Sequence, residues 1–164
     1  MPNEENTLEA IYRRAGFRIR RCHQIAVSIF LDECKEFELT TTQFGLMMAI
    51  HQTPGIDQIN LSRVIGLDRS TTATVVDRMF RRGLLRRDPN PEDRRKNRIS
   101  LTDEGERILG KARAAADRAH DRLLAPLAAD ERDQLLDLLQ RILDANNVNT
   151  RVPLGLPDRQ AGKE

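Results

Sequence analysis

The chain has 164 residues, of which 39% are hydrophobic and 32% are charged, and its formal net charge is +2. That length fits one domain of ordinary size with room for a helical extension. Aromatic residues make up only 4%, so any core is expected to consist mainly of Leu, Ile, Val, Ala and Met. No apolar run approaches the ~18 residues that cross a bilayer, and the polar N-terminus lacks the features of a secretory signal. We therefore expect a cytoplasmic protein without a membrane partner.

Positive charge is concentrated in one part of the chain. From Arg69 to Arg98 there are ten cations and four anions, which gives a local net charge of +6. Because the whole chain carries +2, the remainder carries −4. A basic segment on a mildly acidic body is typical of proteins that bind a polyanion, and it points to nucleic acid.

The first predicted element is a long helix from about Thr7 to Glu36. Asn6 and Glu9 have the spacing of a capping box, and Gly16 permits a bend. Apolar side chains recur along this helix at intervals of three and four residues, which predicts one buried face. They are Ile19, Cys22, Ala26, Ile29 and Phe30.

Cys22 and Cys34 are the only cysteines. On one helix they would lie ~18 Å apart at 1.5 Å rise per residue, which is too far for an intrachain disulfide. No Cys/His pair has the spacing of zinc ligands, so no metal site is expected. Unreactive thiols that pack as small apolar groups are the simpler interpretation, and a redox sensor is the alternative.

Each of the next three predicted helices follows a side chain that can cap it. Thr40, together with Gln43, precedes the stretch FGLMMAIHQ. Asp57 precedes QINLSRVI, and Asp68 precedes RSTTATVVDRMFRR. Glycine favours the end of a helix, and these three helices are expected to end, in turn, at Pro54-Gly55, Gly66 and Gly83.

Two short runs that look like strands, LLRR and RISL, follow and flank the polar loop DPNPEDRRKN. Thr102 is expected to cap a fifth helix through about Leu124, and Asp130 a sixth through about Asn146. The order of four helices, a hairpin and two further helices predicts a mainly α protein with a small β-hairpin wing, a winged helix-turn-helix. The long flanking helices cannot bury their apolar stripes on so small a module, so we expect them to pair with a second copy of the chain.

The fourth predicted helix combines an apolar face with a polar N-terminal end. Hydroxyls in its first turns lower helix propensity, but short donors and acceptors there suit base edges and phosphates in a major groove. The helix N-terminus adds amide donors and partial positive charge. A polar face that meets only solvent is the alternative interpretation. On the apolar face, the side chains expected to pack on the preceding helices are Val75, Val76, Met79 and Phe80.

The segment NLSRVIGLDRSTTATVVDRMFRRGLLRRDPNPEDRRKNRISLTDEG resembles the DNA-binding core of the MarR family of bacterial regulators. The matching patterns are LSRxIGLDRST, VDRMxRRGLLRR and PEDRRxNRIxLTDEG, and the flanking helices extend the resemblance to roughly residues 8–146. The resemblance implies a homodimer whose terminal helices form the interface. It also implies that two winged modules grip a pseudo-palindromic operator in double-stranded DNA, and that a ligand or an oxidant relieves DNA binding.

DNA contacts are expected from two groups of residues. In the fourth helix, which matches the family's recognition helix, they are Arg69, Ser70, Thr71, Thr72, Thr74 and Arg78. In the wing the resemblance implies Arg94, Arg95 and Lys96, with Arg95 as the first choice for the arginine in the minor groove and Arg94 as the second. Asp93 would orient an arginine through a charge-assisted hydrogen bond, and arginine suits a narrow groove because it is less strongly hydrated than lysine. Some of the cations between these groups are expected to contact phosphates: Arg81, Arg82, Arg86 and Arg87.

A small-molecule effector is expected near the first helix, where RRAGFRIRRCHQ contains five arginines. In the resembled family the pocket lies where this helix meets the second and the fifth. The sequence is similar to members that respond to aromatic acids or their coenzyme A thioesters, and no other cofactor is implied. The expected contacts are Arg13, Phe17, Arg20, His23, Gln24, Phe44, Met47 and Met48. The alternatives are a solvated or DNA-facing cationic surface for the arginines, a half-buried histidine for His23, and ordinary core for the methionines.

These expectations divide the chain into four parts. Residues 1–36 contribute to dimerisation and the effector pocket, 37–102 form the DNA-binding domain, 103–146 form the C-terminal dimerisation helices, and 147–164 form a loosely ordered tail. Enzyme activity is not expected, because the chain lacks a Gly-rich phosphate loop, a nucleophile elbow, a metal-ligand cluster and a recognisable carboxylate pair.

The predicted function is a repressor of an aromatic-compound catabolic operon, released from its operator by an aromatic acid or an aromatic acyl-CoA. Two alternatives stay within the regulator class: a response to oxidants through cysteine, and a response to antibiotics or phenolic stress. A winged-helix module that binds only proteins is a more distant alternative.

Overall fold

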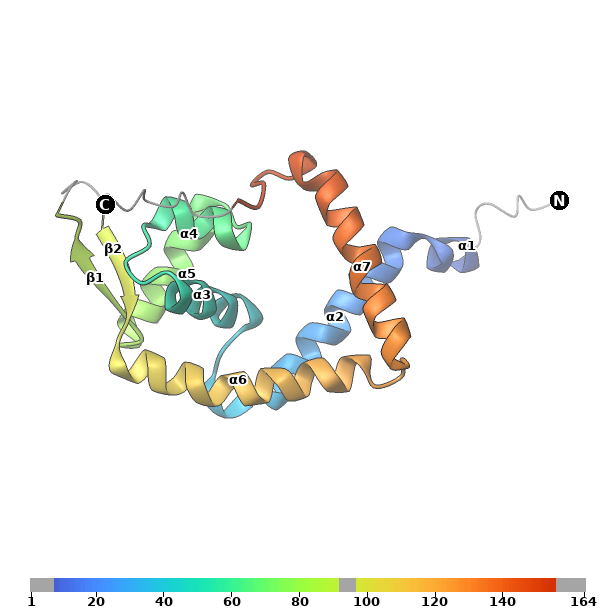
Figure 1. Ribbon diagram of the computed structural model, residues 1–164, viewed down its shortest axis with the longest axis horizontal. Helices are drawn as coiled ribbons and strands as arrows, with labels where there is room; N and C mark the ends of the chain where they lie inside the picture. Colours follow the sequence, from blue (N-terminus) through green and yellow to red (C-terminus); the bar gives the residue numbers. More distant parts are fainter. Residues whose placement is uncertain (1–7, 92–96, 156–164) are drawn as a thin grey trace.

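The computed structural model describes residues 8–91 and 97–155. The elements follow one another along the chain as in Figure 1, and their order confirms a mainly helical fold with one antiparallel hairpin. They are α1 (Leu8–Arg13), α2 (Ala15–Glu33), the 3-10 helix η2 (Lys35–Phe37), α3 (Thr41–Gln52), α4 (Gln58–Ile65), α5 (Arg69–Arg81), β1 (Leu85–Pro89), β2 (Asn97–Leu101), α6 (Asp103–Leu124), α7 (Ala129–Asn146) and η3 (Asn147–Asn149). Within the described ranges, no helix combines the length and apolar character needed to cross a membrane.

Side-chain caps begin four of the helices, as the sequence predicts. At α3 the capping box is reciprocal: the Thr40 hydroxyl accepts from the Gln43 N–H at 3.2 Å, and the Gln43 side chain accepts from the Thr40 N–H at 3.0 Å. Asp57, Asp68 and Thr102 accept from backbone N–H groups in the first turns of α4, α5 and α6. Because caps satisfy donors that a helix cannot satisfy internally, these boundaries are fixed locally.

Two predicted boundaries are wrong. The first helix is not continuous, because Arg14 is extended (φ −71°, ψ 133°) and separates α1 from α2, so Gly16 lies inside α2 rather than at the break. The last long helix begins one residue before Asp130, and its N-terminus is satisfied by Glu131, whose carboxylate accepts from the Ala128 N–H at 2.8 Å. Asp130 then lies in the first turn, where its negative charge interacts favourably with the helix dipole. Asn6 lies outside the described residues.

The main core belongs to the DNA-binding unit, by which we mean α3, α4, α5, the hairpin and the start of α6. Its side chains are at most 1% exposed at Leu46, Met47, Ile50, Leu61, Val76, Met79, Leu84, Ile99 and Leu109. A smaller cluster joins the C-terminal half of α2 to α6 through Phe30, Cys34, Ala115 and Ala119. The α6 helix therefore supports both clusters and runs beneath them (Figure 1).

The hairpin is held close to the helical body. Leu85 pairs with Leu101 and Arg87 with Ile99 in the antiparallel register, and Ile99 also pairs with Ile56 in the loop after α3. At the start of α6, a Cβ on Gly105 would lie 2.2 Å from the Leu84 carbonyl oxygen. Only glycine permits this close approach of two backbones, so Gly105 sets the position of α6 against the hairpin.

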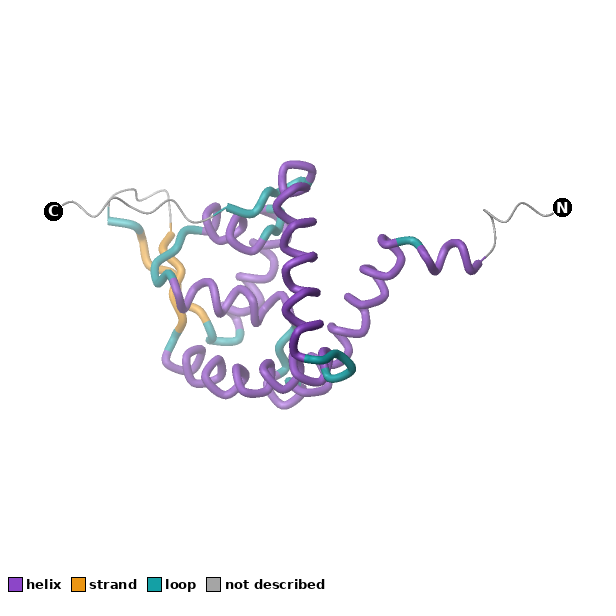
Figure 2. The backbone as a smooth tube through the Cα atoms, turned by 45° about the vertical axis from the view of Figure 1, so that its right-hand side comes forward, coloured by secondary structure: helices purple, strands orange, loops and turns teal. Residues whose placement is uncertain are grey.

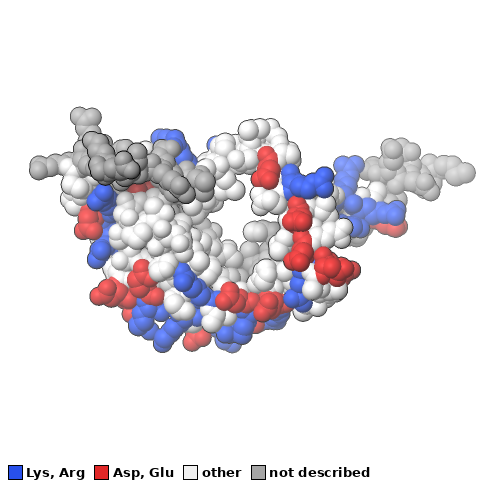
Figure 3. All heavy atoms as spheres, in the orientation of Figure 1, with Lys and Arg blue, Asp and Glu red and all other residues white. Residues whose placement is uncertain are grey.

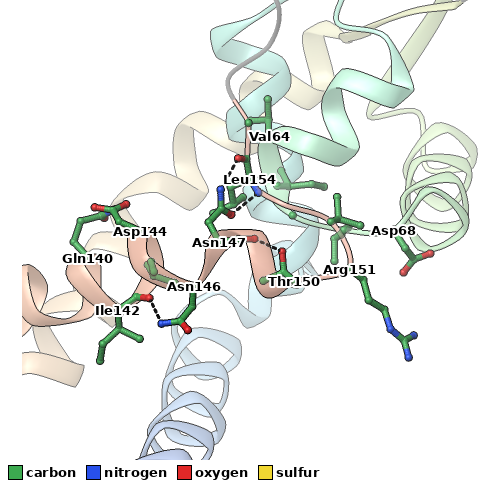
Figure 4. Close-up of a pocket in the computed structure, with 16 residues that line it drawn as sticks. Val64, Asp68, Gln140, Ile142, Asp144, Asn146, Asn147, Thr150, Arg151 and Leu154 are labelled. Carbon is green, nitrogen blue, oxygen red and sulfur yellow. Dashed lines mark hydrogen bonds between the residues drawn. The ribbon is translucent and has the colours of Figure 1, made fainter.

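The prediction of a loosely ordered tail is wrong for residues 147–155. The Asn147 side chain holds the Leu154 backbone at two points, donating to its carbonyl at 3.0 Å and accepting from its N–H at 2.8 Å (Figure 4). The Gly155 N–H then donates to the Arg63 carbonyl at the end of α4, at 3.2 Å. The tail thereby fastens the end of α7 to the DNA-binding unit. Residues 156–164 lie outside the described ranges.

The terminal arms, which are α1, the N-terminal half of α2 (residues 15–24) and α7, have few intrachain partners. Figure 2 shows α1 and this half of α2 projecting from the body. Neither α1 nor α7 contains a fully buried residue. Large apolar side chains of the arms are 38–68% exposed at Leu8, Ile11, Tyr12, Ile19, Leu136, Leu138, Leu139, Ile142 and Leu143. Helices with apolar stripes of this size need a further surface to cover them.

Candidate nucleic-acid interface

The α5 helix presents one polar face to solvent. Val76 and Met79 are fully buried against the unit's core, while residues at intervals of three and four along the opposite side are exposed. These exposed residues are Arg69, Ser70, Thr71, Thr74, Arg78 and Arg81. A stripe of short polar groups followed by arginines is the surface that a helix needs for base edges and phosphates.

Hydroxyl groups at the start of α5 are organised around Asp68. Ser70 and Thr71 each donate a side-chain hydrogen bond to its carboxylate at 2.6 Å, and the Thr71 N–H donates at 2.9 Å. The hydroxyl of Ser70, then those bonds from Thr71, lower the pKa of Asp68 far below its usual value. Since each hydroxyl oxygen still has free lone pairs, this turn presents ordered acceptors that suit the amino groups of adenine and cytosine.

Two residues of this helix lie on the other side from the one the sequence predicts. Thr72 is 0% exposed, and its hydroxyl donates to the Asp68 carbonyl at 2.9 Å, so it belongs to the core and cannot contact a base. Phe80 is 45% exposed instead of packing with Val76 and Met79. The Arg87 guanidinium lies 5.2 Å from the centre of its ring, a cation–π contact at the base of the wing.

Four arginines lie at the end of α5 and in β1, and the structure pairs three of them: Arg82, Arg86 and Arg87. Arg82 donates to the carbonyls of Glu38 at 2.8 Å and Phe37 at 3.1 Å, which fixes the end of α5 to the chain before α3. Arg87 pairs with Asp77 and so fixes β1 to α5. Arg86 lies 3.5 Å from the Asp88 carboxylate, with both side chains exposed. Arg82 and Arg87 are therefore structural, and Arg81 and Arg86 stay available for phosphates.

The wing residues predicted to contact DNA are Asp93, Arg94, Arg95 and Lys96, and all four lie outside the described residues. The described parts of the hairpin end with Pro89 opposite Asn97. This pairing fixes where the loop leaves the hairpin, on the strands that Arg87 and Ile99 attach to the helical body. The assignments within the loop remain predictions.

Comparison with known proteins establishes the family. Residues 39–96 match the sequence profile of the MarR family. The transcriptional regulator HosA of Escherichia coli O111:H- is 34% identical over 136 residues, which are 83% of this chain and 99% of HosA. The chain belongs to the MarR family. It is a DNA-binding transcriptional regulator of a family whose members act as dimers.

Solved structures of other MarR-type regulators share the fold. PcaV of Streptomyces coelicolor in complex with its natural ligand has 38% identity and a TM-score of 0.77, covering 82% of this chain and 95% of PcaV. The repressor CouR bound to a 23-mer DNA duplex has 30% identity and a TM-score of 0.78, covering 83% and 96%. Bordetella bronchiseptica BpsR, whose DNA binding is regulated by 6-hydroxynicotinic acid, has 26% identity and a TM-score of 0.77, covering 81% and 95%.

Within one chain, the eight predicted effector residues form two separate groups. Arg13, Phe17, Arg20, His23 and Gln24 lie on the projecting arm, where only Phe17 is half-buried. Phe44, Met47 and Met48 lie on α3, and Phe44 packs on Phe30 with ring centres 5.5 Å apart. Phe17 and Phe30 are thirteen residues apart on α2, about 20 Å along its axis, so one chain does not close a pocket around all eight. Met47 is 0% exposed and is ordinary core, while Met48 is half-buried.

A cavity of about 860 Å³ lies elsewhere, between the α4–α5 turn, the end of α7 and the tail (Figure 4). Val64, Leu67, Ile142 and Leu154 contribute to its lining, and none of the predicted effector residues does. On the face seen in Figure 3, a hollow lies between α7 and the DNA-binding unit, and acidic and basic side chains are interspersed along α6. This cavity could not be predicted from local sequence, because it depends on the tail folding back onto α4.

Sequence reasoning missed Arg113 on α6. Its Nε donates to the Met48 Sδ at 3.4 Å, and the side chain is half-buried between α6 and α3. The available signal was its spacing of three and four residues from Ala116 and Leu109, which face inward. A cation on the inward stripe of a helix is uncommon unless it is paired, so this position marks an unusual polar site.

Proposed function

We propose that this MarR-family regulator is the repressor of an operon for the breakdown of aromatic compounds, acting in the cytoplasm on a pseudo-palindromic operator. The observation that carries the DNA-binding part is the exposed stripe of α5 on a helix fixed at both ends by Asp68 and Arg82. A rigid helix with ordered hydroxyls followed by arginines can read base edges and hold phosphates at the same time.

The proposed DNA contacts follow from exposure. On α5 they are Arg69, Ser70, Thr71, Thr74 and Arg78, without the buried Thr72. In the wing they are Arg94, Arg95 and Lys96, with Asp93 orienting an arginine. Because a dimer has two such surfaces, its operator should contain two half-sites one or more helical turns apart.

We further propose that an aromatic acid or an aromatic acyl-CoA releases the protein from DNA. Support comes from BpsR, which responds to 6-hydroxynicotinic acid, and from PcaV, which was solved with a natural ligand. In this chain, the junction of α2, α3 and α6 offers the aromatic side chains of Phe30 and Phe44 beside the half-buried Met48. A ligand at that junction would contact the dimerisation helices and the DNA-binding unit together, so it could change their relative position.

The cysteine alternative has less support. Cys34 is 1% exposed, and burial raises the pKa of its thiol, which disfavours the reactive thiolate. Cys22 is exposed, but it lies twelve residues away on the same helical segment, so the two cannot form an intrachain disulfide. Oxidation of a protein carrying Cys22→Ser and Cys34→Ser tests this alternative, since retained sensitivity to oxidant would exclude both thiols.

The DNA-binding proposal is tested by measuring affinity for duplex DNA from beside the protein's own gene at several salt concentrations. Arg95→Ala should weaken binding and reduce the slope of log affinity against log salt by about one. Arg141→Ala, which removes an exposed cation from α7, is the matched control and should leave the slope unchanged. Unaltered binding by Arg95→Ala at every salt concentration would show that the wing assignment is wrong.

The effector proposal is tested on the operator complex with benzoate, 4-hydroxybenzoate, 6-hydroxynicotinate and benzoyl-CoA. At least one compound should release DNA and raise the melting temperature of the free protein, because a ligand that binds only the folded state stabilises it. If this whole series changes neither the melting temperature nor DNA binding, the aromatic effector class is excluded.

A further inference from the structure

We propose that Arg113 is the anion anchor of the effector site, and that the effector is therefore a free aromatic carboxylate and not its coenzyme A thioester. This inference rests on the proposed function, because it names the chemical form of the same ligand. It adds a binding residue on α6 to a site whose predicted contact residues lie on the first and second helices.

The Arg113 guanidinium has an incomplete set of partners. Its Nε donates to the thioether sulfur of Met48 at 3.4 Å. Its Nη2 is buried, and among residues 8–91 and 97–155 it has no hydrogen-bond acceptor. A thioether is a weak acceptor, and a charged donor removed from water is costly unless a strong acceptor meets it. An anionic ligand would supply the acceptor that the described residues do not provide.

Two carboxylates that lie close to α6 are paired with other side chains. Glu106, earlier on α6, is hydrogen-bonded to the His51 Nδ1, 2.7 Å from its carboxylate. Glu33, on α2, lies 3.2 Å from Arg118 and 3.3 Å from Arg122. Neither carboxylate pairs with Arg113. Among the described residues, the buried Nη2 of Arg113 therefore has no acceptor.

A benzoate-like ligand fits the chemistry of this position. A carboxylate has two oxygens and can accept two parallel bonds from a guanidinium. Phe44 lies one helical turn before Met48 on α3 and is half-buried beside Phe30. An aromatic ring attached to the bound carboxylate would therefore meet apolar side chains. The ligand would join α6, which supports the dimerisation arms, to α3 of the DNA-binding unit.

The chemical form of the ligand follows from the anchor. Thioester formation converts the carboxylate into a neutral carbonyl, which has one acceptor oxygen and no charge. The phosphates of coenzyme A lie far from the aromatic ring and cannot replace that charge beside Met48. The same argument excludes aromatic amides, so benzamide is a neutral analogue of nearly equal shape to benzoate.

The experiment measures binding of the free acids, benzamide and benzoyl-CoA to the full-length protein and to Arg113→Met. Losing a charge-assisted pair should weaken acid binding by about 10- to 100-fold. Arg107→Met on the same helix is the matched control, because Arg107 is exposed and pairs with Glu104 at 2.6 Å. Arg107→Met should bind the acids as the unchanged protein does, and benzamide should bind at least 10-fold more weakly than benzoate.

A second measurement separates ligand binding from a structural role. Without ligand, Arg113→Met should melt at the same temperature as the unchanged protein or above it, because the variant loses only a weak bond to the Met48 thioether and no acceptor of Nη2 among the described residues. A structural arginine would instead lower the melting temperature when replaced. Arg113→Lys keeps the charge but not the paired geometry, and it should recover part of the acid affinity.

Three outcomes would overturn the inference. Acid binding that survives in Arg113→Met removes the anchor but leaves the aromatic effector intact. Binding of benzoyl-CoA without the acids contradicts the carboxylate form and likewise leaves the broader proposal standing. Binding of no compound by the unchanged protein removes both the inference and the proposed effector class.

Discussion

The DNA-binding unit and the terminal arms contrast in where their apolar side chains lie. In the unit, nine large side chains from α3 to α6 are at most 1% exposed, whereas α1 and α7 contain no fully buried residue. Both regions are amphipathic, so composition does not distinguish them. The unit buries its apolar side chains within one chain, whereas the arms leave theirs partly exposed. We therefore expect a second copy of the chain to cover the apolar side chains of the arms.

The largest effect is expected when charge is placed on the apolar face of α7. Leu138→Glu together with Leu139→Glu should convert the dimer into monomers, since each buried leucine contributes about 1.5–3 kcal/mol and symmetry doubles the loss. Sedimentation velocity measures the change. Gln134→Glu with Gln140→Glu adds the same charge to exposed polar positions and should remain dimeric. Dimers in both variants would show that the α7 face is not the interface.

Within the unit, the closest backbone approach should be the most sensitive position. Gly105→Ala places a Cβ 2.2 Å from the Leu84 carbonyl oxygen and should lower the free energy of unfolding by about 3 kcal/mol. Urea unfolding measures this loss. Gly110→Ala on the same helix meets no atom within 4 Å and should stabilise by about 0.5–1 kcal/mol. Equal stability of the two variants would contradict the packing of α6 on the hairpin.

Two threonines of α5 should separate stability from DNA recognition. Thr72→Val removes a buried hydroxyl and should cost about 1 kcal/mol in unfolding free energy, with little change in operator preference. Thr74→Val, on the exposed face, should change unfolding by less than about 0.5 kcal/mol but alter discrimination at one base pair by about 1–3 kcal/mol. Unfolding in urea and binding to operator variants measure both. The reverse pattern would mean that α5 is rotated from its described position.

The smallest effect concerns pH. Hydrogen bonds from Ser70 and Thr71 hold the pKa of Asp68 below its unfolded value, so Asp68 adds stability at neutral pH and loses it as the pH falls below about 4. Asp68→Asn should therefore be less stable than the unchanged protein at pH 7, and the gap should narrow near pH 3.5. Urea unfolding at both pH values measures it, and a gap independent of pH would contradict the ionised cap.

Local sequence was sufficient for much of the unit. Thr40 with Gln43, Asp57, Asp68 and Thr102 act on donors at most three residues away, so their roles can be recognised without a fold. The incorrect predictions concern which side of α5 a residue occupies. Thr72 and Thr74 are both hydroxyl residues in a polar stretch, and only the packing of α5 on its neighbours decides which one enters the core. For the same reason, the apolar pattern of α5 predicts a buried Phe80, whereas its side chain is exposed.

The candidate functional residues differ in the same way in how far local sequence predicts them. The recognition helix and its family could be predicted, because a dense set of motif residues lies within about 45 consecutive positions. The proposed effector site could not be predicted from local sequence, since its proposed residues come from α2, α3 and α6. Arg113 is one of many arginines in the sequence, and its significance arises from a contact with Met48 across 65 positions.

By itself, the sequence determined the helix caps, the wing and the DNA-binding family, because hydrogen bonds and apolar periodicity act over short distances along the chain. Tertiary structure decided which side of α5 faces solvent, how the tail attaches α7 to α4, and where a buried guanidinium nitrogen lacks an acceptor among the described residues. Those properties depend on burial, and burial is set by elements distant in sequence that exclude water together.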